Sequence, residues 1–171
     1  MMKILVLSDT HGHIDERILE YASKADEVWH AGDIGNLSVV DQLEKVAKLR
    51  AVFGNIDGQS ARLRFPENNF FEVDGLSVFI RHICGYPGTY NQITRSLIET
   101  NKPKMVICGH SHILKVMRDP RYQHLHMNPG ACGISGFHQI RTMLRFEIEA
   151  AKPTNLEVIE LGARHIKKSP V

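Results

Sequence analysis

The chain has 171 residues, a length that suits one domain with its own hydrophobic core. Hydrophobic residues make up 43% of the sequence, as in an ordinary globular protein, and the formal net charge is +2. This near-balance of charge argues against a dedicated nucleic-acid-binding module and provides no basic patch for a membrane surface.

The cysteines and the N-terminal segment indicate a cytoplasmic protein. Cys84, Cys108 and Cys132 are an odd number without a C-x-x-C pair, so they predict no disulfide framework. Residues 1–7 form an apolar run that is too short for a signal peptide or a membrane span. We therefore expect a reduced, cytoplasmic protein that does not associate with membranes.

Nothing in the sequence marks a domain boundary, because it contains no internal repeat, low-complexity tract or long linker. We predict a single domain over residues 1–171. Within it, residues 163–171 include a cluster of basic side chains and are expected to form a flexible, solvated tail. The sequence does not choose an oligomeric state and leaves a homodimer or a homotetramer open.

The first third of the chain alternates between strand-like and helix-like patterns. Short apolar runs at residues 3–8, 26–31 and 49–53 predict strands. Apolar residues recur at helical spacing within residues 14–22 and again within residues 37–47. This β-α-β-α-β order predicts parallel strands joined by right-handed crossovers.

The remainder of the chain is richer in strands. Asp74 and Gly75 separate two strand-like runs and predict a hairpin over residues 69–81. A helical pattern at residues 93–98 precedes a short apolar run at residues 106–108. Further strands are expected at 114–118, 124–127, 140–148 and 156–161. An α/β front with a β-rich back predicts a sandwich of mixed sheets faced by helices.

Five of the predicted strands lead into a short polar motif. These motifs are Asp9-Thr10-His11, Gly32-Asp33, Gly54-Asn55, His82 and Gly109-His110-Ser111-His112. In open α/β sheets, sites lie beyond the carboxyl ends of the strands. If the strands are neighbours, seven side chains that can bind metal converge there: Asp9, His11, Asp33, Asn55, His82, His110 and His112.

Seven such side chains are too many for one tetrahedral zinc ion but suit two metal ions that share a ligand. The shared ligand should be a carboxylate, because it has two oxygens and its charge offsets the repulsion between cations. Mixed imidazole and carboxylate donors fit manganese, iron, zinc or nickel better than calcium. Paired metal ions serve phosphoryl hydrolysis well. The glycines before Asp33, Asn55 and His110 would allow sharp turns or a close approach of the backbone.

The order D-x-H, G-D, G-N-x-D, a lone H and G-H-x-H resembles the calcineurin-like metallophosphoesterases. The short length and the N-P-G sequence at residues 128–130 resemble the small YfcE-type phosphodiesterase branch of that superfamily. The resemblance spans most of the chain, from Asp9 to Gly130. It implies an α/β fold, a sandwich of two mixed β-sheets flanked by helices.

The resemblance also implies a reaction. A hydroxide held between or on two divalent ions would attack a small phosphodiester, and Asn55 would also contact the phosphate oxygens. Manganese is the expected metal, with nickel, iron, zinc or magnesium as alternatives. The implied ligands are Asp9, His11 and His112 for one ion, Asn55, His82 and His110 for the other, and Asp33 as the bridge.

Two positions depart from the pattern of the superfamily. Where the wider superfamily carries a histidine that helps to protonate the leaving group, this chain has Ile56. The small branch commonly departs here too, usually with cysteine. Isoleucine cannot transfer a proton, which puts the cleavage of poor leaving groups in doubt. Ile83 follows His82, where relatives more often carry glycine.

The other polar residues are not assigned to the site. We interpret His13 as a helix-start residue, His30 as support for a ligand, and His124 and His126 as residues of a back strand near an edge. His138 carries no signal. Three arginines could contact phosphate, but the pattern does not single one out: Arg62, Arg64 and Arg81.

Two other classes of protein share parts of this pattern. A eukaryotic retromer subunit resembles the family in fold and works as a protein-interaction scaffold. The intact ligand set favours an enzyme, whereas an exposed hydrophobic patch without metal would favour the scaffold. An amidohydrolase also uses His-x-His, but its barrel typically needs about 250 residues. It also carries that motif early in the chain, not at residues 110–112.

Overall fold

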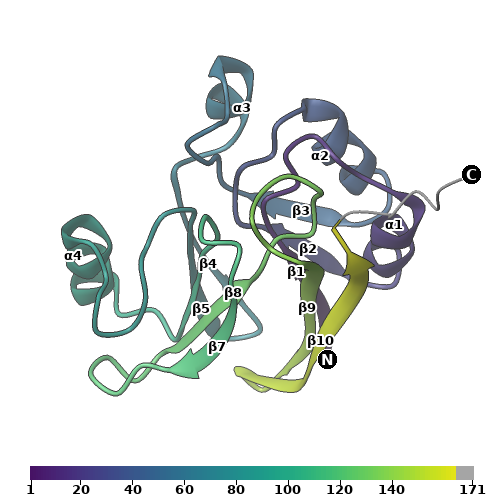
Figure 1. Ribbon diagram of the computed structural model, residues 1–171. Coiled ribbons are helices and arrows are strands. Elements are labelled where there is room, and N and C mark those ends of the chain that lie inside the picture. The colour runs from purple at the N-terminus through teal and green to yellow at the C-terminus, as the bar shows by residue number, and fades with distance from the viewer. Residues whose placement is uncertain (165–171) are drawn as a thin grey trace, which may run out of the picture.

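The computed structural model describes residues 1–164 and contains two five-stranded mixed β-sheets with helices on their outer sides (Figure 1). The strands of the first sheet are β1 (Met2–Leu7), β2 (Glu27–His30), β3 (Lys48–Ala51), β9 (Ile140–Glu149) and β10 (Lys152–Ala163). Those of the second are β4 (Asn68–Val73), β5 (Leu76–Arg81), β6 (Met105–Ile107), β7 (Leu114–Arg118) and β8 (Leu125–Pro129). The helices are α1 (Glu16–Ala22), α2 (Leu37–Glu44), α3 (Gln59–Arg64) and α4 (Gln92–Asn101). The predicted sandwich is confirmed.

The strand order places parallel strands beside one another in each sheet. The first sheet runs β10-β9-β1-β2-β3, and β1, β2 and β3 are parallel, as the alternating pattern predicted. The second runs β4-β5-β6-β8-β7, and β5, β6 and β8 are parallel. Within each sheet, the carboxyl ends of the parallel strands therefore open at the same edge.

Alternation along β1 assigns its side chains to two separate cores. Ile4 and Val6 point into the cluster between the sheets, where residues of both sheets meet. Leu5 and Leu7 point the other way, into a cluster that includes residues of α1 and α2. Successive strand residues face opposite sides, so one apolar run serves both layers. Burying each such side chain contributes about 1.5–3 kcal/mol relative to leaving it exposed.

Helices α1 and α4 begin where a side chain satisfies a free backbone N–H group. Asp15 accepts from Ile18 at the start of α1, and Asn91 accepts from Thr94 at the start of α4. Helix α3 was not predicted. It starts at Gly58 without a side-chain cap, and Ala61 is its one buried residue, so it has no apolar stripe to detect. Figure 1 shows α3 apart from the helices that cover the two sheets.

The hairpin predicted at Asp74 and Gly75 joins β4 to β5, and both turn residues have positive φ. The predicted tail starts too early, because Ala163 ends β10 and the backbone N–H of Arg164 donates to Gln139. Residues 165–171 lie outside the described residues. Over residues 1–164, no helix is long and apolar enough to cross a membrane.

Candidate metal centre

The predicted ligands form two groups of three at the carboxyl ends of the strands. One group is Asp9, His11 and His112, and the other is Asp33, His82 and His110; within each group, one ligand atom from every residue lies within 4.8 Å of the others. Asp9, His11 and Asp33 follow β1 and β2 of the first sheet. The histidines at positions 82, 110 and 112 follow β5 and β6 of the second. Each triad therefore needs both sheets.

Asp9 is the buried carboxylate of the first triad. Its Oδ2 accepts from Ser8 Oγ at 2.6 Å and from the backbone N–H of His110 at 3.1 Å. Its Oδ1 faces the imidazoles, with His112 Nε2 at 3.1 Å and His11 Nε2 at 3.8 Å. Hydrogen bonds to Oδ2 thus fix the carboxylate in place, and Oδ1 remains available to a metal ion.

Asp33 lies between the two triads. Its Oδ1 is 3.1 Å from Nε2 of His82, and its Oδ2 is 3.4 Å from Nε2 of His11. His82 donates from Nδ1 to the carbonyl of Ala31 at 2.7 Å, so the lone pair of its Nε2 points toward the carboxylates. Asn55 lies beside the second triad, with its amide oxygen 3.0 Å from Nδ1 of His110.

Three buried polar atoms of this cluster have no hydrogen-bond partner among the described residues: Asp9 Oδ1, His11 Nε2 and His82 Nε2. Buried polar atoms are rarely left unpaired, because desolvation without a new partner is unfavourable. Carboxylate oxygens and imidazole nitrogens are the donors that a divalent transition metal accepts. The residues present therefore fit two metal ions.

The carboxylates and the histidines of the cluster shift each other's pKa values in favour of their charged forms. Burial opposes ionisation of Asp9 and Asp33, but contacts with histidines outweigh it and hold the pKa of both carboxyls below its usual value. The bond to Asp9 raises the pKa of His11 despite partial burial. Burial opposes protonation of His82, yet Asp33 and Asp9 raise its pKa. The carboxylates are thus ionised, and their negative charge favours either protonated histidines or metal ions beside them.

Five of the candidate ligands have left-handed backbone conformations that non-glycine residues rarely adopt. Their φ angles are 56° for Asp9, 46° for His11, 55° for Asp33, 71° for His110 and 60° for His112. Each such residue costs about 1–3 kcal/mol. These left-handed residues lie in the loops that follow β1, β2 and β6, where the candidate ligands of the two sheets meet.

Two glycines allow the loops to approach this closely. A Cβ at Gly54 would lie 2.1 Å from Oδ1 of Asp33, and one at Gly109 would lie 2.1 Å from Oγ of Ser8. Both contacts are shorter than any real Cβ tolerates, so a side chain at either position would displace a candidate ligand or the residue that holds it.

Two further residues of the sequence motifs hold the loops together. The buried carboxylate of Asp57 accepts from the backbone N–H groups of Ile34, Gly35 and Gly54, at 3.1, 2.8 and 2.7 Å. It thereby joins the loops that carry Asp33 and Asn55. In the N-P-G sequence, Asn128 Nδ2 donates to the carbonyl of Gly109 at 2.9 Å and steadies the loop with both His110 and His112.

His138 is a supporting residue that the sequence analysis missed. Its Nε2–H donates to the carbonyl of Gly133 at 2.9 Å, which leaves Nδ1 as an acceptor. That Nδ1 is 3.2 Å from Nδ1 of His112, so His112 donates there and directs the lone pair of its own Nε2 toward Asp9. His138 lies 26 residues beyond His112 in a loop without a motif, so no sequence signal was available.

The other histidines have structural roles. His124 and His126 are fully buried, and both rings bond the hydroxyl of Tyr90, at 2.8 and 2.7 Å. Their interpretation as residues near an edge was wrong, because both are buried and β8, which contains His126 and begins directly after His124, lies inside its sheet, between β6 and β7. Burial lowers the pKa of His30 to about 4, and its Nε2 is 2.9 Å from Thr10, inside the first motif. His13 bonds Asp15, the cap of α1, at 3.0 Å.

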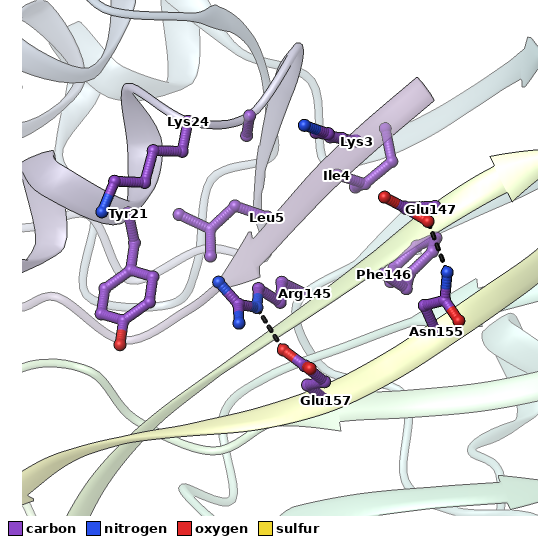
Figure 2. Close-up of a pocket in the computed structure, with 11 residues that line it drawn as sticks. Lys3, Ile4, Leu5, Tyr21, Lys24, Arg145, Phe146, Glu147, Asn155 and Glu157 are labelled. Carbon is purple, nitrogen blue, oxygen red and sulfur yellow. Dashed lines mark hydrogen bonds and ion pairs between the residues drawn. The ribbon is translucent and has the colours of Figure 1, made fainter. Parts of the chain in front are cut away.

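Two cavities differ in their relation to this cluster. A cavity of about 180 Å³ is lined by Asn55 and His82 together with Phe53, Gly54, Arg62, Glu67, Arg81 and Ile83. A larger one, of about 470 Å³, lies between α1, β1, β9 and β10 and contains none of the candidate ligands (Figure 2). Four of its polar side chains pair with one another, Arg145 with Glu157 and Asn155 with Glu147. Of these two cavities, the smaller one therefore adjoins the candidate ligands.

Residues 2–151 match the calcineurin-like phosphoesterase superfamily domain, and the chain belongs to that superfamily. A phosphodiesterase from Methanocaldococcus jannaschii is 30% identical over 149 residues, covering 77% of this chain and 84% of that protein. The crystal structure of a predicted phosphoesterase from Streptococcus pneumoniae has a TM-score of 0.71 at 22% identity, covering 95% of this chain and 90% of the other. Zinc-complexed Vps29 from Entamoeba histolytica has a TM-score of 0.72 at 15% identity, covering 93% and 99% of the two chains. The family prediction is confirmed, and the protein is a phosphoesterase.

The raised pKa values of His11 and His82 predict how metal affinity depends on pH. Unperturbed imidazole titrates at about 6.5, and both groups remain protonated above that pH in the metal-free protein. A metal ion must displace these protons, so affinity should rise with pH through and beyond this range and fall in mild acid. Manganese titrations at graded pH, with proton release recorded, measure this. An affinity independent of pH would contradict histidine ligation.

The contact between His138 and His112 predicts that His138 supports metal binding without touching the metal. His138→Phe removes the acceptor for Nδ1–H of His112 and should weaken metal binding about 10- to 100-fold. His138→Gln retains a carbonyl acceptor and should recover part of the loss. His13→Phe alters a histidine that bonds Asp15 instead and is the matched control. Competition with a chelating dye gives the affinities, and equal values for all variants would contradict the role.

Proposed function

We propose that the protein is a metal-dependent phosphodiesterase that hydrolyses a small phosphodiester at a dinuclear centre. The carboxylate of Asp33 carries this proposal. Its two oxygens face different triads, one at 3.1 Å from His82 and the other at 3.4 Å from His11. A carboxylate in this position can bridge two ions, and its negative charge offsets their mutual repulsion.

The roles of the other residues follow from their positions. Asp9, His11 and His112 would hold one ion, and His82 and His110 the other, with Asn55 beside them. When bound, such ions lower the pKa of a coordinated water to about 7 in favourable sites and offset charge on phosphoryl oxygens. Asn55 is exposed and lines the cavity, so its amide can contact the phosphate. Mixed imidazole and carboxylate donors suit manganese, with nickel, iron, zinc or magnesium as alternatives.

An apolar rim supports a diester as the substrate. Ile56, Ile83 and Ile113 each directly follow a candidate ligand, and their exposed fractions are 47%, 38% and 59%. Ile83 also lines the cavity that contains Asn55 and His82. A diester is a monoanion with two organic groups, which such a rim can contact. A monoester carries more charge and offers one organic group fewer.

The scaffold alternative is weaker. The likeness to Vps29 structures is below 25% identity and concerns the fold. All seven candidate positions carry a competent donor, and six of them fall into two compact triads. A scaffold has no need of two such triads, nor of the strained turns that form them.

Asp33→Asn tests the dinuclear centre. The substitution keeps the shape of the side chain but removes the charge that two cations would share. We expect the wild type to bind two manganese ions per chain, and the variant to lose one of them together with orders of magnitude of phosphodiesterase activity. Asp41→Asn, which removes a surface carboxylate paired with Arg64, is the control. One ion in the wild type, or near-normal turnover in Asp33→Asn, would contradict the proposal.

Ile56 generates a prediction about leaving groups. An aryl oxide departs without a proton, whereas an alkoxide needs a general acid, which is typically worth about 10²–10⁴-fold. We expect good hydrolysis of activated aryl diesters and poor hydrolysis of alkyl monoesters. Ile56→His should raise kcat/KM more for poor leaving groups than for good ones.

The measurement is kcat/KM across diesters whose leaving groups have graded pKa values. Ile83→His is the matched control, because this isoleucine is also exposed and also follows a candidate ligand. Parallel dependences on leaving-group pKa for the wild type and Ile56→His would mean that position 56 does not limit proton transfer.

A further inference from the structure

The three arginines left open by the sequence differ in their partners. Arg64 binds Asp41 and Glu44, each at 2.6 Å. Arg81 bonds Asn68 at 2.6 Å and pairs with Glu67 at 3.0 Å. Arg62 has no carboxylate within 4.0 Å in the described part of the chain. Its positive charge is therefore available to a ligand.

The guanidinium of Arg62 is nevertheless held in place. Its Nε–H donates to the carbonyl of Asp57 at 2.7 Å, and Nη2 lies 3.5 Å from the carbonyl of Gly54. The guanidinium carbon is 4.5 Å from the ring centre of Phe53, a cation–π contact. Both carbonyls belong to the turn that carries Asn55. A guanidinium has five N–H donors, so three remain for a ligand.

The side chain that carries these donors belongs to a residue that lines the cavity described above. Arg62 lines this cavity of about 180 Å³ together with Asn55 and His82, one residue beside the second triad and one within it. Glu67 neutralises Arg81 in the same wall, so the unbalanced charge there is that of Arg62. An anchored guanidinium with free donors fits an oxyanion, because its planar fork matches phosphate oxygens.

We propose that Arg62 binds the phosphoryl group of the substrate, and this rests on the proposed function. A phosphodiester has two non-bridging oxygens. One can face the triads while the other accepts from Arg62. Phe53 and Ile83, in the same cavity wall, then contact an organic substituent of the ester. The substrate class is a phosphodiester small enough for its phosphoryl group to enter this cavity, with an apolar or aromatic substituent.

Arg62→Gln tests this proposal, with Arg64→Gln as the matched control from the same helix. A hydrogen bond to a charged partner contributes enough that its loss should weaken binding about 10- to 100-fold. We expect Arg62→Gln to weaken inorganic phosphate binding to the manganese-loaded protein by this factor and to raise KM for aryl diesters. Arg64→Gln should change neither value, and Arg62→Lys should recover part of both. Calorimetry gives the phosphate affinity, and steady-state kinetics gives KM and kcat.

Measurements of metal affinity distinguish two roles of Arg62, binding of the phosphoryl group and support of the turn at residues 54–57. If Arg62 only braced residues 54–57, Arg62→Gln would weaken manganese binding as well as phosphate binding, and that result would overturn the proposal. Equal phosphate affinities for Arg62→Gln and Arg64→Gln would also overturn it. Phosphate binding that depends on Arg62 in a protein that hydrolyses no diester would support the anion site and contradict the proposed function, so the two failures are distinguishable.

Discussion

Two buried carboxylates, Asp9 and Asp33, face one set of imidazoles, and the architecture of this end of the molecule depends on holding these like charges close together. Neighbouring buried anions repel each other strongly unless cations or hydrogen-bond donors stand beside them. The histidines come from the second sheet as well as the first. The apolar cluster between the sheets therefore does more than stabilise the fold, because it packs together the strands whose ends carry the candidate ligands.

The turn at residues 54–57 contacts the loop that carries Asp33 and the helix that carries Arg62. Gly54 touches Asp33 so closely that no side chain fits, and the backbone N–H of Ile56 donates to Asp33 at 3.2 Å. The side chain of Asp57 anchors the neighbouring loop, and its carbonyl anchors Arg62. One short turn thus combines support of the Asp33 carboxylate, an exposed isoleucine and an anchor for a positive charge.

The candidate ligands with left-handed backbone conformations lower the stability of the fold in return for the geometry of the site. Five such residues together oppose folding by several kcal/mol. Backbone hydrogen bonds between the loops offset this cost, among them those from Asp9 to Gly32 and from His11 to Asp33, each at 3.0 Å. Asn128, in the N-P-G sequence, and His138, which lies in no motif, add side-chain bonds. Backbone strain of this kind persists where the surrounding hydrogen bonds fix the conformation of the loop, as they do here.

The sequence by itself determined the layered α/β fold and the ligand candidates, because both are local properties. An apolar run followed by Asp, Asn or His identifies a strand end, and Asp74-Gly75 identifies a hairpin whatever surrounds it. The tertiary structure decided what depends on distant segments: the membership of each triad, the bond between His138 and His112, the burial of His124, and the difference between Arg62 and Arg64. Two arginines on one short helix look alike in a sequence, since neither type nor spacing shows which one has a carboxylate partner. The packing of α3 beside the turn at 54–57 places Arg62 in the cavity wall, where no carboxylate of residues 1–164 pairs with it.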